Sequence, residues 1–587
     1  MESLLVRMCI DAATESASAV EKWRRQRRTL ERMPSHLADD LLRHLLRRRL
    51  LFPSLLEVFK YSVEEIDLRG ESFVDAEWMA YLGAFRYLRS MVLADCHKIN
   101  NSALWNITGL MNLKELDLSR CSKITDEGIR HLLSVPDLEK LCISETGVSA
   151  NGISILASLT NLMMLDLGGL PVTDSTLSSL QALKKLQHLD LWGSEISNKG
   201  AVLLKTFPSL SFLNLAWTNV TDLPNLSSLA YLNMSNCTIH SLFEGEGQKP
   251  YLEKLILSGA TITNVDVAFE CVETRRLCFL DISNSSVQSF GFLSSMNAMT
   301  DLNLSGTALT DNFVEHIAHT GDNLRYLNLS STRVSSDGIA SLAGYVPSLE
   351  TLLLCGTSID DKALPYISMM PSLKVINLSS TNVKGLIYQE NRIPDEVPSF
   401  SALESLSHLE RLDLEDTHIK DAGLCPLTNM AKLSYLSLKN VSLTDASLHQ
   451  ISSSAKLMYL GFRDAVLTDT GLAAFVPPPA LEVLDLRGCW LLTQDGILHF
   501  CHKHLQIEVK HRFVETLDKK NSPYSSPSRA TTKSLQFKHK VGKLSVSPLK
   551  SDDIFLDQRL KYSKEELLAL QFCSATFSTS TSTLQFV

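Results

Sequence analysis

A short pattern of apolar and polar positions recurs along most of the chain between residues 60 and 510. Leu113, Leu116 and Leu118 show it as L-x-x-L-x-L, whose alternation puts Leu116 and Leu118 on one face of a short strand. Most strand starts lie 24 or 25 residues apart; they include Val63, Leu88, Leu113, Leu138, Leu162, Leu186, Leu210, Leu324, Leu349 and Leu373. The pattern predicts about eighteen units, ending near Leu481.

The second half of each unit predicts a helix. Behind the first strand described above, Cys121 turns the chain inward and Thr125-Asp126-Glu127-Gly128 begins a turn. Ile129, Leu132 and Leu133 then recur at helical spacing, and we expect them to face the same core. One unit cannot bury these apolar faces alone, whereas stacked neighbours can, so the pattern predicts a solenoid.

These units resemble leucine-rich repeats. The T-D-x-G turn, seen again at Thr468-Asp469-Thr470-Gly471, is similar to that of the intracellular ribonuclease-inhibitor-like and cysteine-containing classes. The resemblance implies an α/β fold, a leucine-rich-repeat solenoid of the ribonuclease-inhibitor-like horseshoe type. The L-x-G-x-I-P pattern of plant receptor ectodomains is absent, so we expect a cytoplasmic protein.

We expect three parts in the chain. Residues 1–60 are predicted to form a helical N-terminal cap, residues 61–510 the leucine-rich repeats, and residues 511–587 a disordered tail. The tail is rich in Ser, Pro, Thr and Lys between residues 521 and 547 and cannot build a core.

Two units break the period. The unit from Leu210 is short, because the next start, Leu229, follows after 19 residues, so its convex segment is predicted to be extended. The unit from Leu373 to Leu409 is long and carries an insertion at residues 384–398. That insertion is either a binding loop or a tolerated excursion.

Composition and charge favour a soluble protein that does not bind nucleic acid directly. The 587 residues are 44% hydrophobic and 21% charged, with a net charge of -9 and a pI of about 6.0. We expect no secretory signal and no membrane partner, because the opening apolar run contains charges and no apolar run is long enough to span a bilayer. Cys96, Cys121, Cys237 and Cys489 recur at the inward turn and are expected to be reduced, packed thiols.

The N-terminal sixty residues are locally basic and contain two candidate adaptor boxes. The segment around residues 33–42 resembles the start of an F-box and the cullin-contacting box of elongin-type ubiquitin ligases, as in leucine-rich-repeat substrate receptors. The candidate residues are Leu5, Cys9, Ala13, Pro34, Leu37 and Leu41. A structural cap with a solvated basic face is the favoured alternative, and an RNA or nuclear-import patch stays open.

Outward strand positions are predicted to form a concave surface for a protein partner. An acidic thread runs along it, made of Asp67, Asp117, Asp166, Asp190, Asp281, Asp413 and Asp485. Trp192 and Trp217 add aromatic surface, and Lys439, Arg463 and Arg487 make the far end basic. Such charges also serve solubility alone, and that alternative stays open.

No pattern predicts an enzyme. The sequence shows no metal-ligand spacing, no glycine loop that would cradle a phosphate, and no nucleophile with a base and an orienting group. We therefore expect no catalytic residue, no metal and no cofactor.

The tail contains a short apolar island and three Ser-Pro pairs. Ser522, Ser526 and Ser547 precede Pro and are candidate phosphorylation sites. The island reads Y-x-x-x-x-L-Φ-x-x-Q, with Tyr562, Leu567, Leu568, Leu570 and Gln571 preceded by Arg559 and Lys561. Ser563 and Glu566 form a capping box, so the island is expected to form a helix on binding.

This island resembles the motif by which initiation factor 4G docks on the cap-binding translation initiation factor 4E. Together with the repeats, it makes the chain similar to the plant leucine-rich-repeat proteins that bind factor 4E. The resemblance implies a non-enzymatic translation factor whose further partners include factor 4A, factor 3 and poly(A)-binding protein. A ubiquitin-ligase substrate receptor and a plain adaptor are the alternatives.

Overall fold

The computed structural model of the protein describes residues 4–25, 33–388 and 396–514. The chain divides into two units, Met1–Lys520 and Asn521–Val587, and every described residue belongs to the first. That first unit is an α/β solenoid, as the repeat pattern predicts.

Nineteen short strands form one parallel sheet, in which each strand pairs with the strand of the next repeat. The second residue of each strand points into the core, and its two neighbours point to the concave face. The strands are β1 (Glu65–Asp67), β2 (Ser90–Val92), β3 (Glu115–Asp117), β4 (Lys140–Cys142), β5 (Met164–Asp166), β6 (His188–Asp190), β7 (Phe212–Asn214), β9 (Tyr231–Asn233), β12 (Lys254–Ile256), β14 (Phe279–Asp281), β15 (Asp301–Asn303), β16 (Tyr326–Asn328), β17 (Thr351–Leu353), β18 (Val375–Asn377), β21 (Arg411–Glu415), β22 (Tyr435–Lys439), β23 (Tyr459–Arg463), β24 (Val483–Asp485) and β25 (Glu508–Lys510).

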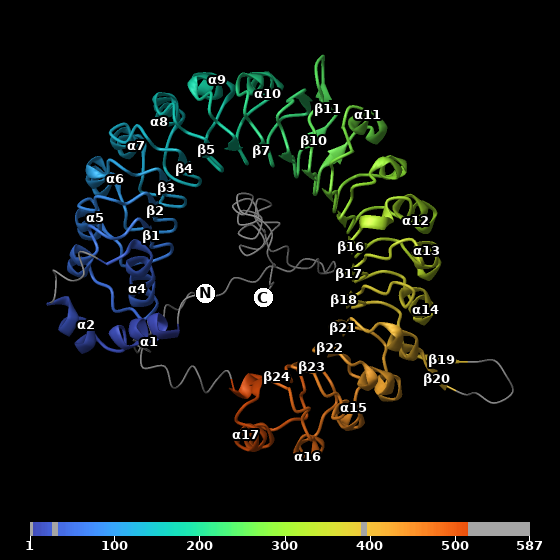
Figure 1. The fold of residues 1–587 in the computed structure, drawn as a ribbon. Coiled ribbons are helices and arrows are strands. Elements are labelled where there is room, and N and C mark those ends of the chain that lie inside the picture. The colour runs from blue at the N-terminus through green and yellow to red at the C-terminus, as the bar shows by residue number, and fades with distance from the viewer. Residues whose placement is uncertain (1–3, 26–32, 389–395, 515–587) are drawn as a thin grey trace, which may run out of the picture. The chain divides into compact units, whose positions relative to one another are not determined.

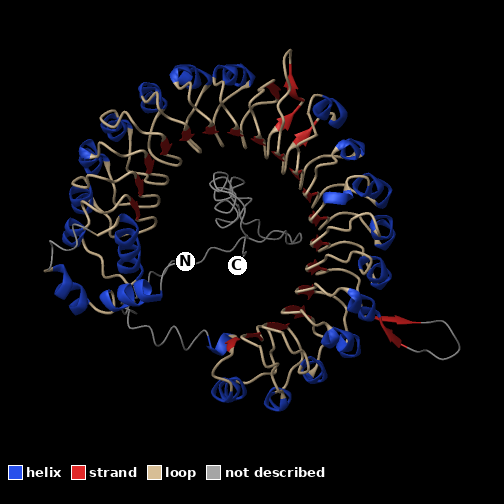
Figure 2. Cartoon of the chain, in the orientation of Figure 1, coloured by secondary structure: helices blue, strands red, loops and turns tan. Residues whose placement is uncertain are grey.

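Helices cover the outer side of the solenoid, and the sheet lines its inner side (Figures 1 and 2). Parallel strands lie about 4.8 Å apart, whereas a helix with its side chains is about 10 Å wide, so a strand layer stacked on a helix layer must curve. The outer α-helices are α5 (Ala76–Leu82), α6 (Asn101–Leu104), α7 (Asp126–Leu132), α8 (Ala150–Ile155), α9 (Asp174–Ser179), α10 (Asn198–Leu203), α11 (Val265–Glu270), α12 (Asp311–Ala318), α13 (Ser336–Leu342), α14 (Leu364–Ile367), α15 (Asp445–Ile451), α16 (Asp469–Ala474) and α17 (Gln494–Lys503). Between them run the 3-10 segments η2 (Trp105–Gly109), η3 (Leu156–Ser158), η4 (Leu180–Ala182), η5 (Leu204–Thr206), η6 (Gly291–Ser295), η7 (Gly321–Asn323), η8 (Asp361–Ala363), η9 (Ser399–Ser405) and η10 (Asp421–Asn429).

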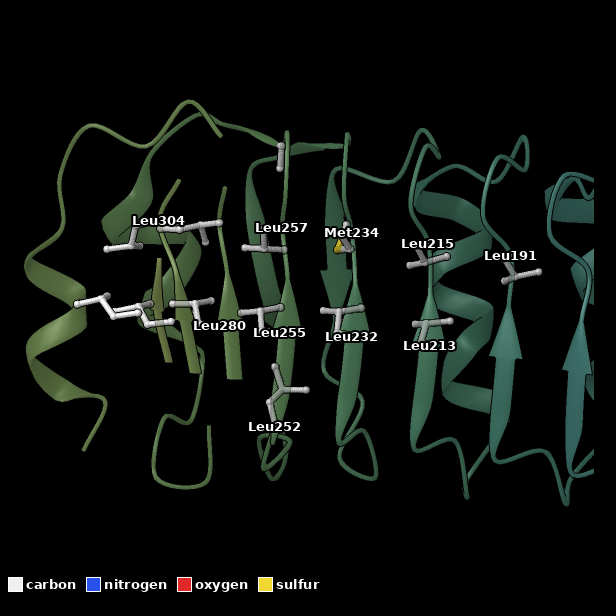
Figure 3. Packing of buried hydrophobic residues seen from close by; sticks show 14 of the residues in the cluster. Leu191, Leu213, Leu215, Leu232, Met234, Leu252, Leu255, Leu257, Leu280 and Leu304 are labelled. Carbon is white, nitrogen blue, oxygen red and sulfur yellow. The ribbon is translucent and has the colours of Figure 1, made fainter. Parts of the chain in front are cut away.

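The core consists of leucine rows that run at right angles to the strands. Figure 3 shows two of these rows between β6 and β15, and every labelled side chain in them is fully buried. One row contains Leu213, Leu232, Leu255 and Leu280, and the other contains Leu191, Leu215, Met234, Leu257 and Leu304. Each leucine therefore packs against its equivalents in the two neighbouring repeats, which explains why one repeat alone has no core.

The N-terminal region is helical, as expected, and covers the first edge of the solenoid. It contains α1 (Leu4–Ala13), α2 (Ala17–Arg24), α4 (Ser35–Arg47) and the 3-10 segment η1 (Pro53–Val58). Leu42 and Leu45 of α4 are buried, and α4 contacts β1. Trp23 Nε1 donates a hydrogen bond of 2.9 Å to the carbonyl of Ala13 and ties α2 to α1.

An aspartate at the start of one helix bonds to the helix start of the next repeat. Asp126 accepts hydrogen bonds from the backbone N–H of Ser149 at 2.7 Å and from its hydroxyl at 2.5 Å. The same two bonds join Asp174 to Ser197, Asp311 to Ser335, Asp421 to Thr444, Asp445 to Thr468 and Asp469 to Thr493. They satisfy amides that helix starts leave without an intrahelical partner.

The glycine of the T-D-x-G turn leaves room for that aspartate. A Cβ added at Gly152 would lie 2.2 Å from Asp126 Oδ1, and one added at Gly471 would lie 2.0 Å from the Asp445 side chain. The turn motif is therefore a contact between repeats as well as a local helix start.

The repeat count differs from the sequence prediction, because β25 adds a strand after the unit at Leu481. Its second residue, Val509, is buried, but His511 stands where the equivalent unit has Leu486, and Gln506 stands where it has Leu481. His511 is only 1% exposed, so a histidine fills the leucine position and hides the last repeat from the pattern.

Other expectations are confirmed or corrected by the packing. The short unit from Leu210 is extended on its convex side, where β8 (Asp222–Pro224) pairs with β11 (Ser241–Glu244), and β10 (Thr238–Ile239) pairs with β13 (Thr261–Ile262). The insertion begins and ends in an antiparallel hairpin of β19 (Leu386–Tyr388) and β20 (Glu396–Pro398). Leu133 was expected in the core but is 41% exposed, because α7 ends before it.

The four recurring cysteines are buried free thiols, as expected. Each Sγ reaches back to a backbone carbonyl of the preceding repeat; the distances are 3.1 Å from Cys96 to Leu68, 3.1 Å from Cys121 to Leu93, 3.2 Å from Cys237 to Leu215 and 2.9 Å from Cys489 to Phe462. Burial raises the pKa of the Cys96 and Cys121 thiols to about 12, so they remain protonated donors.

Candidate interaction surface

Three rows of side chains cross the concave face of the sheet. Each strand presents its first and third residues there, and the residue two positions later adds a third row. Neighbouring strands are in register, so side chains of one row lie directly beside each other. The chemistry of these rows changes along the solenoid.

At the N-terminal strands, charges are paired between neighbouring repeats. Lys140 of β4 lies 2.6 Å from Glu115 of β3, and Arg120 Nε lies 2.6 Å from Asp95 Oδ1. Arg69 lies 4.0 Å from Asp117. This sector satisfies its own charges and presents a mixed polar surface.

An aromatic row crosses the middle of the concave face. The ring of His188 on β6 stacks on Phe212 of β7 at 3.6 Å, and Phe212 stacks on Tyr231 of β9 at 4.1 Å. Lys254 of β12 lies 4.0 Å over the ring of Phe279 on β14. Desolvation lowers the pKa of His188 to about 3, so the row is uncharged at its β6 end. Because the ring faces of His188 and Phe212 contact each other, this ridge offers a partner its ring edges.

The predicted acidic thread forms the third-residue row, and most of its carboxylates bond to their own chain. One oxygen accepts from the backbone N–H two residues later; the distances are 3.0 Å for Asp67, 2.9 Å for Asp117, 2.8 Å for Asp281, 3.2 Å for Asp413 and 3.1 Å for Asp485. The aspartates thus shape the strand ends. Two of them, Asp166 and Asp190, are buried and are not a free surface.

Asp166 and Asp190 have only neutral hydrogen-bond donors. Asp166 accepts from Ser144 Oγ at 2.8 Å and from the Gly168 amide at 3.0 Å. Asp190 accepts from the Trp192 amide and from Asn214 Nδ2, both at 3.0 Å. Desolvation raises the pKa of both carboxyls, and the charge of Asp166 raises that of Asp190 further.

Trp192 and Trp217 both lie at the concave face and are half-buried. The Trp192 indole covers Gly168, where an added Cβ would lie 2.0 Å from Trp192 Nε1. Trp217 follows β7 with a φ of 61°, in the left-handed region. The two indoles belong to adjacent repeats and flank the third-residue row on the side opposite the aromatic row.

Lys439, Arg463 and Arg487 lie beside each other on the last strands, as predicted, but each has an acidic partner. Lys439 lies 2.9 Å from Asp416, Arg463 lies 2.9 Å from Glu415, and Arg487 lies 2.6 Å from Asp485. The expected basic end is therefore a balanced network of ion pairs.

Aromatic rings also line this C-terminal sector. Tyr435 and Tyr459 stack at 4.2 Å, and the guanidinium of Arg411 lies 3.8 Å over the Tyr435 ring. Tyr459 donates a hydrogen bond of 3.1 Å to Asp485. Desolvation and the nearby Asp485 charge raise the pKa of Tyr459, so its hydroxyl stays protonated.

The structure separates the two candidate adaptor boxes. Leu5 is 70% exposed on α1 and Cys9 is exposed beside it, whereas Ala13 at the end of α1 is half-buried. On α4, Leu41 is only 5% exposed, Leu37 is half-buried, and Pro34 is exposed just ahead of the helix. The box on α1 is accessible, and the box on α4 faces mainly the core.

The remaining predicted sites lie outside the described residues. They are Ser522, Ser526 and Ser547, and the motif residues Arg559, Lys561, Tyr562, Leu567, Leu568, Leu570 and Gln571.

The described residues bring no group of three or more His, Cys, Asp or Glu side chains together that could hold a metal ion. Within the same ranges, no helix is long and apolar enough to cross a membrane. The chemistry that the concave face offers is recognition, through stacked rings, buried carboxylates and ion pairs.

The sequence reading missed the aromatic row. His188, Phe212, Tyr231 and Phe279 each stand one residue before the central leucine of their strand. Aligning the units by that leucine places them in one column, so the signal is present but becomes visible only once strand register is known.

Comparisons with known proteins agree with this architecture. A family model described as leucine-rich repeat matches residues 109–133, 323–343 and 405–427. No curated protein sequence matches the chain. Each matched range covers a strand of the sheet or the 3-10 segment before it, together with the convex element that follows.

Solved structures of low sequence identity are also similar to this chain. An internalin (InlF) from Listeria monocytogenes is 20% identical, over 61% of this chain and 93% of that one, with a TM-score of 0.41. A leucine-rich-repeat protein of Leptospira interrogans is 16% identical, over 78% and 98%, with a TM-score of 0.44. The TLR13 chain of a TLR13–ssRNA13 complex is 22% identical, over 74% and 66%, with a TM-score of 0.47.

Proposed function

We propose that this chain, which is a leucine-rich-repeat protein, acts as a non-enzymatic adaptor in translation initiation. It binds the cap-binding factor 4E through residues 559–571 and presents its concave sheet to other initiation components. The observation that carries the proposal is the spacing of Tyr562, Leu567 and Leu568 in the sequence. A cytoplasmic location follows from this role.

The energetics of the motif support a real but modest affinity. Burying Tyr562, Leu567 and Leu568 yields roughly 1.5 to 3 kcal/mol each. Ordering the segment costs about 2 to 5 kcal/mol. Because the margin is narrow, each anchor is needed for binding.

The concave face supports the scaffold half of the proposal. Its sectors differ in chemistry, from paired charges to stacked rings to a cation and tyrosine network, so one sheet offers separate surfaces to separate partners. The full architecture resembles CERES, the plant leucine-rich-repeat protein that binds factor 4E. That resemblance makes factor 4A, factor 3 and poly(A)-binding protein the candidate partners of the repeats.

Capture on cap-analogue resin tests the proposal. The full-length protein with Tyr562→Ala and Leu567→Ala is expected to lose capture through factor 4E. The matched control is Ile554→Ala with Leu556→Ala, which removes two apolar residues of the same tail outside the motif. Capture that is lost equally in both variants, or in neither, rejects the motif as the docking site.

A ubiquitin-ligase substrate receptor is the second candidate. The observation that favours it is the exposed face of α1, where Leu5 is 70% and Met8 is 60% exposed and Cys9 is exposed. An adaptor of the elongin type would cover these side chains. Co-purification of such an adaptor that is lost on Leu5→Asp, with factor 4E capture absent, favours this candidate over the translation adaptor.

A further inference from the structure

One pair of residues on the concave sheet contradicts ordinary strand pairing. Asp166 of β5 and Asp190 of β6 lie directly opposite each other in register. Among the registered pairs of the described sheet, no other pair joins two acidic residues. Like charges in directly opposed positions destabilise a sheet.

The surroundings do not relieve this repulsion. Both carboxylates are buried, with 4% and 7% exposure, and the donors to them, Ser144, Gly168, Trp192 and Asn214, are neutral. No printed ion pair in the described part of the chain reaches either carboxylate, and the nearest cation along the sheet, Lys140 of β4, is paired with Glu115. Burying like charges without a cation is costly, so the site holds unmet electrostatic demand.

An apolar ridge lies beside the acidic pair. The first residues of the same strands are Met164 and His188, and His188 stacks on Phe212 of β7. Side chains two residues apart on one strand share a face, so the ridge and the carboxylates line the same sector. A long cationic side chain fits both features, because its methylene stem packs on apolar surface while its charged end reaches the carboxylates.

We propose that the concave sector of β5, β6 and β7 binds a lysine or arginine side chain of a partner protein, with its charged group at Asp166 and Asp190 and its stem against Met164, His188 and Phe212. This inference rests on the proposed scaffold role and names the class of partner segment, a cationic peptide, for one sector. Complementary charge is the reason for this choice, since a cation turns the like-charged pair into a paired site.

A fluorescence polarisation titration of the full-length protein tests the inference. The probe is a short labelled peptide of alternating Lys and Ser, and peptides with Gln or Glu in place of Lys are its comparisons. The Lys peptide is expected to bind, and Asp166→Asn with Asp190→Asn is expected to weaken it by about tenfold or more. Binding that depends on added Ca²⁺ and is removed by EDTA assigns the pair to a metal and overturns the inference.

The matched control is Asp413→Asn. Asp413 occupies the same strand position as Asp166, and it also accepts from a serine of the preceding strand, Ser379 Oγ at 2.6 Å, and from the amide of Glu415. If this variant weakens the peptide as much as the double variant does, the binding reflects general acidity and the inference is wrong. Unchanged binding in the double variant is equally contradictory.

Two further variants keep the test decisive. Asp166→Asn alone retains its hydrogen bonds, because the amide oxygen still accepts from Gly168 and the amide nitrogen can donate to Ser144, so a folded single variant is expected. Tyr562→Ala with Leu567→Ala is expected to bind the Lys peptide normally. Loss of peptide binding with factor 4E capture intact concerns this sector, and the reverse concerns the proposed function.

Discussion

At the scale of single residues, the turn between strand and helix depends on one contact across repeats. The Asp126 carboxylate holds the helix start at Ser149 and occupies the space beside Gly152. Desolvation raises the pKa of Asp126, but hydrogen bonds from Ser149 and Gly152 outweigh it and the net pKa is lowered. The carboxylate therefore stabilises the fold above about pH 4 and loses that effect as the pH falls further.

Gly152→Ala is expected to lower the free energy of unfolding by about 1 to 3 kcal/mol, because its methyl group must displace Asp126. Gly291→Ala is the control, since a Cβ there meets nothing within 4 Å. Urea denaturation measures both. Equal stability of the two variants would show that the turn glycine is not required for this contact.

The Asp166 and Asp190 pair predicts the opposite dependence on pH. Desolvation raises the pKa of Asp166 to about 6 and that of Asp190 to about 8, with further charge effects from Asp117 and from Asp166 itself. A raised carboxyl pKa stabilises the fold fully below the unfolded value near 4 and loses that contribution as the pH rises through the folded value.

Asp166→Asn is therefore expected to lose less stability than the unmodified protein between about pH 4 and pH 8. Urea midpoints at several pH values measure the slope, with Asp413→Asn as the comparison. A slope that stays unchanged in Asp166→Asn contradicts the account of the pair. The groups that surround it are Asp117, Cys142, Glu145 and His188.

At the scale of elements, α4 is expected to act as a cap that hides the first edge of the core. Leu45 is fully buried, so Leu45→Ala is predicted to cost about 2 to 5 kcal/mol of stability. Leu5→Ala on α1 changes an exposed leucine and is expected to have little effect. Thermal melts of the two variants distinguish a cap from a detachable adaptor segment, for which both changes would be neutral.

The elements show what a sequence can and cannot predict. Strand starts such as Leu113 and the extended short unit at Leu210 follow from spacing, because every buried row is repeated. The strand β25 was missed because His511 replaces a leucine, and Leu133 was misplaced because a helix end depends on its neighbours. Local patterns report what is buried more reliably than where an element stops.

The site was predicted in part. Spacing placed Trp192, Trp217, Lys439, Arg463 and Arg487 together on one face, but it could not give their partners. Ion pairs, stacked rings and the Asp166 and Asp190 register arise between strands about 24 residues apart. Such contacts are fixed by register between repeats, which one unit does not encode.

At the scale of the whole molecule, the account joins a rigid repeat scaffold to a short binding motif elsewhere in the chain. Each repeat contacts only its neighbours, so surface changes in one sector leave the others intact. Substitutions within residues 559–571 are therefore expected to leave the melting temperature of the repeats unchanged.

Calorimetric titration of the full-length protein with purified, cap-bound factor 4E tests the central claim most directly. The account predicts saturable binding, weakened about 100-fold or more by Tyr562→Ala with Leu567→Ala, because two anchors of roughly 1.5 to 3 kcal/mol each are lost. The Ile554→Ala, Leu556→Ala control is expected to bind normally. Undiminished affinity in a Tyr562→Ala, Leu567→Ala variant that melts like the unmodified protein would contradict the account.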